Sequence, residues 1–255
     1  MRRIRIFAFF RAVAGAAVLA TTATPAAADF KVFMPDAEPG ELEFEPLGDY
    51  GLDPNNAHSH ETSFVEEFEY GFTNFWRTGL ELEQDRDAGS GQSVRFSQVT
   101  WENILQFTER GQYLLDAGFF FEFGKTTLSG EPNEVTFGPI FRKEIFGTIN
   151  TVNLFIEKDV GTNAAGAPTF LYNWETRLAL GTPIEPGFQA YGRPSGFEGF
   201  TSKWPQDNRI GPQLFGTILH LGPGNLKWNA GILFGVSAAA PRQTLRWQAE
   251  YEIHF

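Results

Sequence analysis

Hydrophobic and polar residues alternate along most of the chain. In residues 245–255, LRWQAEYEIHF, every second residue is apolar and the residues between them are charged or polar. Successive side chains of a strand point to opposite faces, so this pattern predicts a strand with one apolar and one charged face. A strand of this length is long enough to cross a bilayer at a tilt, which takes about 9–11 residues.

The same alternation recurs in twelve segments between residues 41 and 255. Connections near 73–74, 109–111, 146–148, 182–183 and 222–224 are tight, whereas those near 48–61, 85–92, 126–133, 161–167, 194–207 and 238–241 are mostly longer and polar. A change of phase near Ser97 and Gln98 predicts a β-bulge. An even number of strands with tight turns at one end and longer loops at the other predicts an all-β, closed, antiparallel up-and-down transmembrane barrel.

The end of the chain carries a resemblance. A final strand that closes on Phe255, with Ile253 and Tyr251 at alternate positions before it, resembles the C-terminal assembly signal of bacterial outer-membrane β-barrels. The runs GPQLFGTI and TLRWQAEYEIHF are similar to those of uncharacterised proteobacterial porin-like and transporter-like barrel proteins. The resemblance implies a bacterial cell outer membrane location, contact with its lipid, and recognition by the barrel-assembly machinery through the final strand. The alternative is a secreted β-sandwich, which has no reason to sort its loops by length.

The N-terminal region has a different composition. Residues 1–28 combine Arg2, Arg3 and Arg5, a short apolar stretch and Ala26-Ala27-Ala28, which is typical of a secretory signal peptide. Residues 29–40 contain Pro35 and Pro39 and little periodicity, so we expect an irregular lead-in on the periplasmic side before the barrel at 41–255. No later apolar run is long enough for a membrane-spanning helix.

Composition supports the barrel and excludes some functions. Phe and Gly each number 27, and there is no Cys, so disulfides are excluded. Residues 1–28 hold four arginines and no acids, so without them the formal charge of −11 becomes −15. So acidic a chain is not expected to bind nucleic acid, which requires a basic surface.

The polar faces of the strands are the main candidate site. In a membrane barrel the apolar face meets lipid, so the charged face lines the lumen. We expect a passive channel or transporter for small solutes, with a preference for cations because acidic residues predominate on this face. The alternative is a non-conducting structural or surface-interaction barrel that acts through its outer loops. The residues expected to line the lumen are Glu67, Arg77, Glu81, Glu102, Asp116, Glu122, Arg142, Glu144, Glu175, Arg177, Arg193, Arg246 and Glu250.

Other chemistry has weaker support. His58 and His60 alternate near Asp53, which is a weak metal-site pattern in what we expect to be a solvated outer loop. Some outer-membrane barrels are phospholipases or proteases, but we find no Ser, His and Asn arrangement of the phospholipase kind, and His58, His60 and Asp53 give the protease class little support. We therefore expect neither an enzyme nor a bound cofactor.

Overall fold

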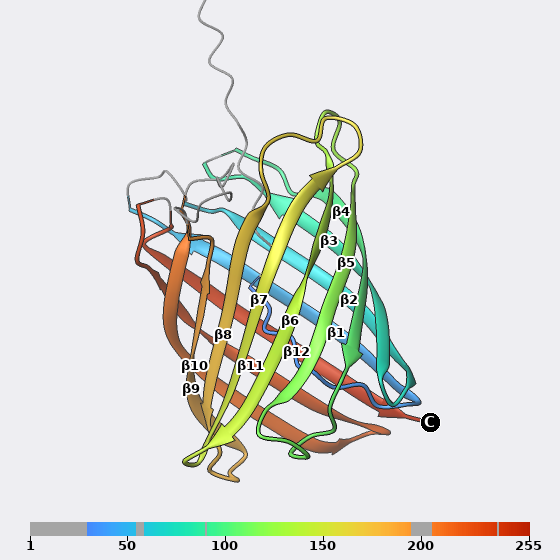
Figure 1. Ribbon diagram of the computed structural model, residues 1–255. Coiled ribbons are helices and arrows are strands. Elements are labelled where there is room, and N and C mark those ends of the chain that lie inside the picture. Colours follow the sequence, from blue (N-terminus) through green and yellow to red (C-terminus); the bar gives the residue numbers. More distant parts are fainter. Residues whose placement is uncertain (1–29, 55–58, 90, 195–205, 239) are drawn as a thin grey trace, which may run out of the picture.

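The computed structural model describes residues 30–54, 59–89, 91–194, 206–238 and 240–255. Within these ranges it contains twelve strands (Figure 1). They are β1 (Glu41–Leu52), β2 (Thr62–Thr73), β3 (Trp76–Arg86), β4 (Arg95–Gln106), β5 (Asp116–Thr126), β6 (Asn133–Ile145), β7 (Thr148–Val160), β8 (Thr169–Leu178), β9 (Ile184–Gly192), β10 (Asn208–Leu221), β11 (Gly224–Gly235) and β12 (Gln243–His254).

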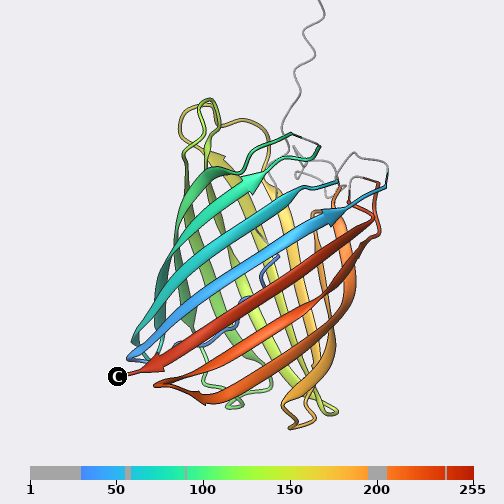
Figure 2. The same ribbon diagram turned by 180° about the vertical axis from the view of Figure 1, so that it is seen from behind.

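The strands form one closed barrel. Each strand pairs antiparallel with its neighbours in sequence, and β1 pairs with β12 from Glu41 opposite His254 to Leu52 opposite Gln243. The prediction of a closed antiparallel barrel of about twelve strands is therefore confirmed (Figures 1 and 2). The C-terminal end of β12 and the turns β2–β3 and β6–β7 lie at one end of the barrel, which we call the turn end; the opposite end is the loop end.

The two faces of the wall differ in polarity. Large apolar side chains such as Leu80, Trp101 and Phe188 project outward and are about half exposed, whereas Glu67 and Thr151 are fully buried in the interior. Strand β7 alternates between half-buried and buried residues along its whole length. Because closure pairs every strand edge, the backbone polar groups are satisfied without water, as a hydrocarbon environment requires. The apolar face is therefore the lipid-facing surface.

No helix in the described ranges is long and apolar enough to cross a membrane.

Two boundaries differ most from those expected from sequence. β1 continues to Leu52, where a loop was predicted from residue 48, because its second half pairs with both β2 and β12. The connection between β4 and β5 spans residues 107–115 rather than 109–111. Its own hydrogen bonds hold it out of the strand: the Gly111 amide donates to the Asp116 carboxylate at 2.7 Å, and the Gln112 amide donates to the Glu109 carbonyl at 3.1 Å.

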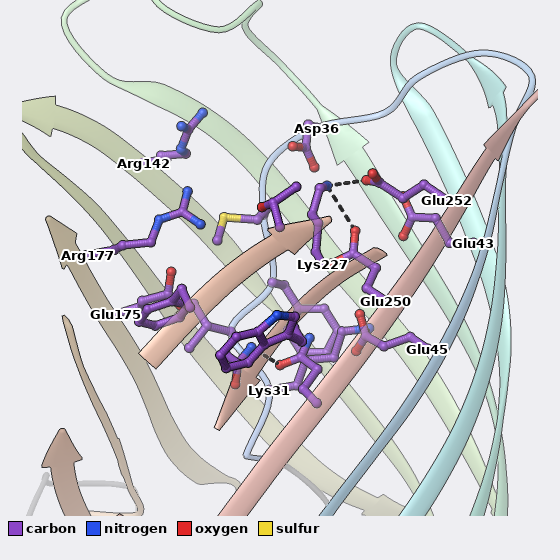
Figure 3. A pocket seen from close by; sticks show the side chains of 18 of the residues that line it. Lys31, Asp36, Glu43, Glu45, Arg142, Glu175, Arg177, Lys227, Glu250 and Glu252 are labelled. Carbon is purple, nitrogen blue, oxygen red and sulfur yellow. Dashed lines mark hydrogen bonds and ion pairs between the residues drawn. The ribbon is translucent and has the colours of Figure 1, made fainter. Parts of the chain in front are cut away.

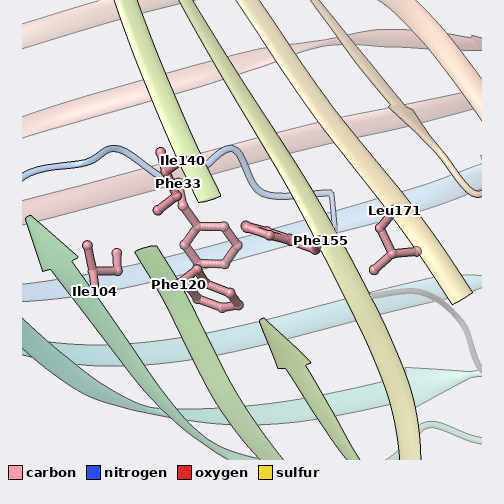
Figure 4. Packing of buried hydrophobic residues seen from close by; sticks show 6 residues of the cluster. All are labelled: Phe33, Ile104, Phe120, Ile140, Phe155 and Leu171. Carbon is pink, nitrogen blue, oxygen red and sulfur yellow. The ribbon is translucent and has the colours of Figure 1, made fainter. Parts of the chain in front are cut away.

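Residues 30–38, which we call the plug segment, contain no strand and lie inside the barrel (Figure 2). Phe30, Lys31, Val32 and Phe33 are all buried. The Phe33 ring packs on Phe120 with ring centroids 4.1 Å apart, within a cluster from several strands (Figure 4): Ile104, Phe120, Ile140, Phe155 and Leu171. The structure thus differs from the expected periplasmic lead-in: this segment fills the middle of the lumen.

Candidate functional site in the barrel lumen

Alternation along the strands brings most of the predicted lumen residues to the interior. Seven of them are buried by neighbouring strands and the plug segment: Glu67, Arg77, Glu102, Asp116, Arg142, Glu175 and Arg246. Glu81 and Glu122 border a small cavity together with Glu102, and Arg177 and Glu250 line a larger one near the turn end.

Two predicted lumen residues lie near the ends of the barrel. Glu144 is at the end of β6, with 54 % of its side chain exposed, and pairs with Arg110 at 2.8 Å and with Arg142 at 2.9 Å. It therefore belongs to the rim rather than to the lumen. Arg193 follows β9 directly and pairs with Glu157 at 3.1 Å.

An acidic cluster lies in the lumen wall on β2 and β4, the two strands that flank β3. One carboxylate oxygen from each of Glu67, Glu69 and Glu102 lies within 4.8 Å of the other two. The Lys31 ammonium of the plug segment makes a close contact with Glu67 and pairs with Glu45 at 3.3 Å. Burial alone would lower the pKa of Lys31, but the nearby carboxylates raise it well above its ordinary value, so the side chain is charged at neutral pH.

A second acidic cluster lies nearer the turn end and is neutralised differently. It consists of Glu41 and Glu43 of β1 and Glu252 of β12. Its cations belong to other strands of the wall: Arg77 pairs with Glu43 at 2.9 Å, and Lys227 contacts Glu252. This cluster is therefore compensated without the plug segment.

A cavity of about 240 Å³ lies beside the plug segment near the turn end, and Lys31, Asp36 and Glu38 of that segment are among its lining residues. Figure 3 shows Arg142 and Arg177, with Glu175 beside them, on one side of it and acidic residues on the other: Glu43, Glu45, Glu250 and Glu252. Lys227 lies among these acids with 46 % of its side chain exposed, so water reaches this region. Charges of opposite sign on the two walls set up an electric field across the cavity.

Side chains of the wall hold the backbone of the plug segment. The Asn153 side chain both accepts from the Phe33 amide at 2.8 Å and donates to the Phe33 carbonyl at 2.9 Å. Asn173 donates to the Lys31 carbonyl at 2.9 Å, and the Ala37 amide donates to Gln106 at 2.7 Å. These bonds satisfy backbone groups that would otherwise be buried without partners.

Sequence reasoning missed the plug segment and the lumen residues that contact it. Lys31, Glu45 and Glu69 were absent from the predicted site, although the alternating glutamates of residues 41–45 already pointed to the interior face. The run FKVFM at 30–34 was a signal for a buried segment, because four of its five residues are apolar. The prolines that follow it indicated that the segment is not a strand.

The histidine pair expected as a weak metal site is only partly described. His58 lies outside the described residues. The ring of His60 contacts the hydroxyl of Tyr50 through its Nδ1 atom at the loop end of β1. Metal binding by this pair stays a prediction.

A closed antiparallel barrel with an apolar outer face and a charged interior defines the class of this protein: it is a β-barrel of the bacterial outer membrane, surrounded by membrane lipid. No protein-family model matches the chain, and no curated protein matches it.

Solved structures similar to the chain include LpxR from Salmonella typhimurium, at 6 % identity and a TM-score of 0.41, covering 84 % of this chain and 100 % of that one. OccK9 (OpdG) of Pseudomonas aeruginosa matches at 11 % identity and a TM-score of 0.29, covering 84 % and 97 %. OccK11 (OpdR) of the same organism matches at 11 % identity and a TM-score of 0.25, covering 88 % and 100 %. All three likenesses are distant.

Proposed function

We propose that the protein is a channel for small solutes, with a preference for cations, and that the plug segment closes it in this structure. Conduction requires residues 30–38 to leave the lumen or to shift within it. The channel carries out no catalysis and needs no cofactor.

The observation that carries the proposal is the polarity of the wall behind the plug segment. A barrel that only had to be filled could pack its interior with apolar side chains, as small barrels do. Here the part of the wall that packs on Phe33 is apolar, whereas the part that faces Lys31 is acidic, with Glu45, Glu67 and Glu102 all buried. Rings of carboxylates favour cations in channels.

The second candidate function is a non-conducting barrel that acts through its outer loops. The packing of Phe33 against Phe120 and Phe155 favours it, because this cluster is the contact expected of a permanent core. The two functions differ in whether the plug segment can move.

Planar-bilayer recording separates the two functions. We expect the refolded protein to be mostly silent and the double variant Phe33→Ala, Asn153→Ala to carry steady, cation-preferring current, because it lacks both the ring packing and the backbone clamp. Asn150→Ala is the matched control, since Asn150 lies on the same strand and bonds Thr148 rather than the plug segment.

Folding of each variant is checked by comparing the gel migration of boiled and unboiled samples. A folded double variant that stays silent would reject the channel in favour of the non-conducting barrel. Reversing the charges of Glu81, Asp116 and Glu122 should shift the reversal potential in a salt gradient. An unchanged potential would mean that these residues do not line the path.

A further inference from the structure

The acidic cluster of Glu67, Glu69 and Glu102 is incompletely satisfied. All three side chains are at most 2 % exposed. Neither carboxylate oxygen of Glu102 has a hydrogen-bond partner among the described residues, and the same holds for Oε1 of Glu67 and Oε2 of Glu69. Buried carboxylates without partners are costly, so a cluster of this kind calls for a cation.

The plug segment supplies part of the positive charge that this cluster needs. The Lys31 ammonium contacts Glu67 and Glu45, and Arg77 reaches only the edge of the cluster, with its Nε 3.4 Å from Glu69. In contrast, the cluster of Glu41, Glu43 and Glu252 takes its cations from the strands themselves. Removing the plug segment would therefore leave the first cluster short of positive charge, whereas the second cluster would lose no cation, since the segment contributes only the acids Asp36 and Glu38 near it.

We propose that Glu45, Glu67, Glu69 and Glu102 form a binding site for a divalent cation of calcium size, and that the Lys31 ammonium occupies it as a tethered cation. Calcium takes about 6–8 oxygens at about 2.3–2.6 Å, so oxygens on opposite sides of the ion lie about 5 Å apart. The triad oxygens, within 4.8 Å of one another, fit that sphere. Four carboxylates offer up to eight oxygens.

Calcium binding at this site does not depend on the proposed channel function. Only the role of the site in conduction rests on that function. A divalent cation and Lys31 compete for the same carboxylates, so binding of the ion favours departure of the plug segment. The cluster thereby becomes the point at which an incoming cation and the plug segment exclude each other.

Titration calorimetry with calcium chloride tests the site without any current. The chain without residues 1–28 is refolded in detergent free of lipopolysaccharide, and the variants Lys31→Met and Lys31→Met, Glu102→Gln are compared with it. We expect Lys31→Met to bind calcium at least tenfold more tightly than the unsubstituted protein, because the competing ammonium is gone. The added Glu102→Gln should weaken that binding at least tenfold.

Lys143→Met is the matched control, because Lys143 alternates with the lumen residue Arg142 and so lies on the outer face of β6. Its calcium affinity should equal that of the unsubstituted protein. The site is rejected if folded Lys31→Met gains no affinity, or if Glu102→Gln does not reduce the gain.

A second measurement applies if Lys31→Met does not fold. In the unsubstituted protein, calcium should speed hydrogen exchange of the Phe33 amide, whereas potassium chloride of equal ionic strength should not. An equal effect of the two salts, or none, would overturn the proposal. If the folded variant Phe33→Ala, Asn153→Ala stays silent while calcium binding is intact, the channel alone is rejected; if that variant conducts while calcium does not bind, the site alone is rejected.

Discussion

At the scale of single residues, Asn153 is the side chain that fixes the plug segment. Its amide group pairs with both the N–H and the carbonyl of Phe33, as a neighbouring strand would. The plug segment therefore needs no strand partner at Phe33, where its buried backbone groups are satisfied by this one side chain.

Asn153→Ala should loosen the plug segment without opening the barrel. Each buried group left without a partner costs about 1–3 kcal/mol, so exchange of the Phe33 amide should speed up by about 5- to 150-fold. Hydrogen exchange measured by mass spectrometry reports this, with Asn150→Ala as the control that leaves the rate unchanged. Equal rates in Asn153→Ala and the unsubstituted protein would show that ring packing alone holds Phe33.

Alternation in the sequence predicts the direction of single lumen side chains but not their partners. Glu67 and Arg77 fall on the polar face by position alone. The contact between Lys31 and Glu67 joins residues far apart in the chain, one of them in an irregular segment. Only the closed barrel brings them together, so no local pattern could reveal the pair.

At the scale of elements, strand β4 contains the predicted bulge. Glu83 pairs with Gln98 and Gln84 with Phe96, so Ser97 is the extra residue. The bulge keeps Phe96 on the outer face with Trp101 despite their opposite parity, and both side chains are exposed. This feature was predictable because one inserted residue is the simplest way to change the phase between two regular amphipathic runs.

Deleting Ser97 should be tolerated, whereas deleting Thr100 should not. Without Ser97 the strand becomes regular, and the side chains on both sides keep their faces. Without Thr100, which lies in regular pairing opposite Glu81, one part of the strand must turn its apolar side chains into the lumen. Gel migration of unboiled samples distinguishes the two deletions, and equal loss of the folded form in both would contradict this role of the bulge.

At the scale of the whole molecule, the lipid-facing surface gives a depth-dependent prediction. Leu80, on the outer face of β3, pairs with Phe68 and Trp101 away from both strand ends. Leu80→Arg should lower the free energy of unfolding in lipid vesicles by about 2–4 kcal/mol, whereas Leu180→Arg, within the β8–β9 connection at the turn end, should cost about 0–1 kcal/mol. Equal costs at the two positions would mean that the outer face does not meet hydrocarbon.

The barrel as a whole was predictable because twelve amphipathic strands indicate it, and because four of the five connections at the turn end are shorter than every loop at the opposite end; the connection at 107–115 is the exception. The filling of its lumen was not, because alternation specifies a wall and not what lies within it. The segment at residues 30–38 lacks periodicity, so the sequence indicated only that it is not a strand. Its place depends on Asn153, Asn173 and Gln106, whose amides could equally have faced water.

The seam between β1 and β12 joins the first and last strands of the sheet, and the plug segment leads straight into the first of them. The Gly40 carbonyl at this junction accepts from the Phe255 amide at 3.1 Å. If the barrel closed first, the plug segment would have to enter its lumen through one open end. If the plug segment already lies along the concave side of the open sheet, the sheet can instead close around it. Pairing of β1 with β12 would then complete the barrel and enclose the segment in the same step.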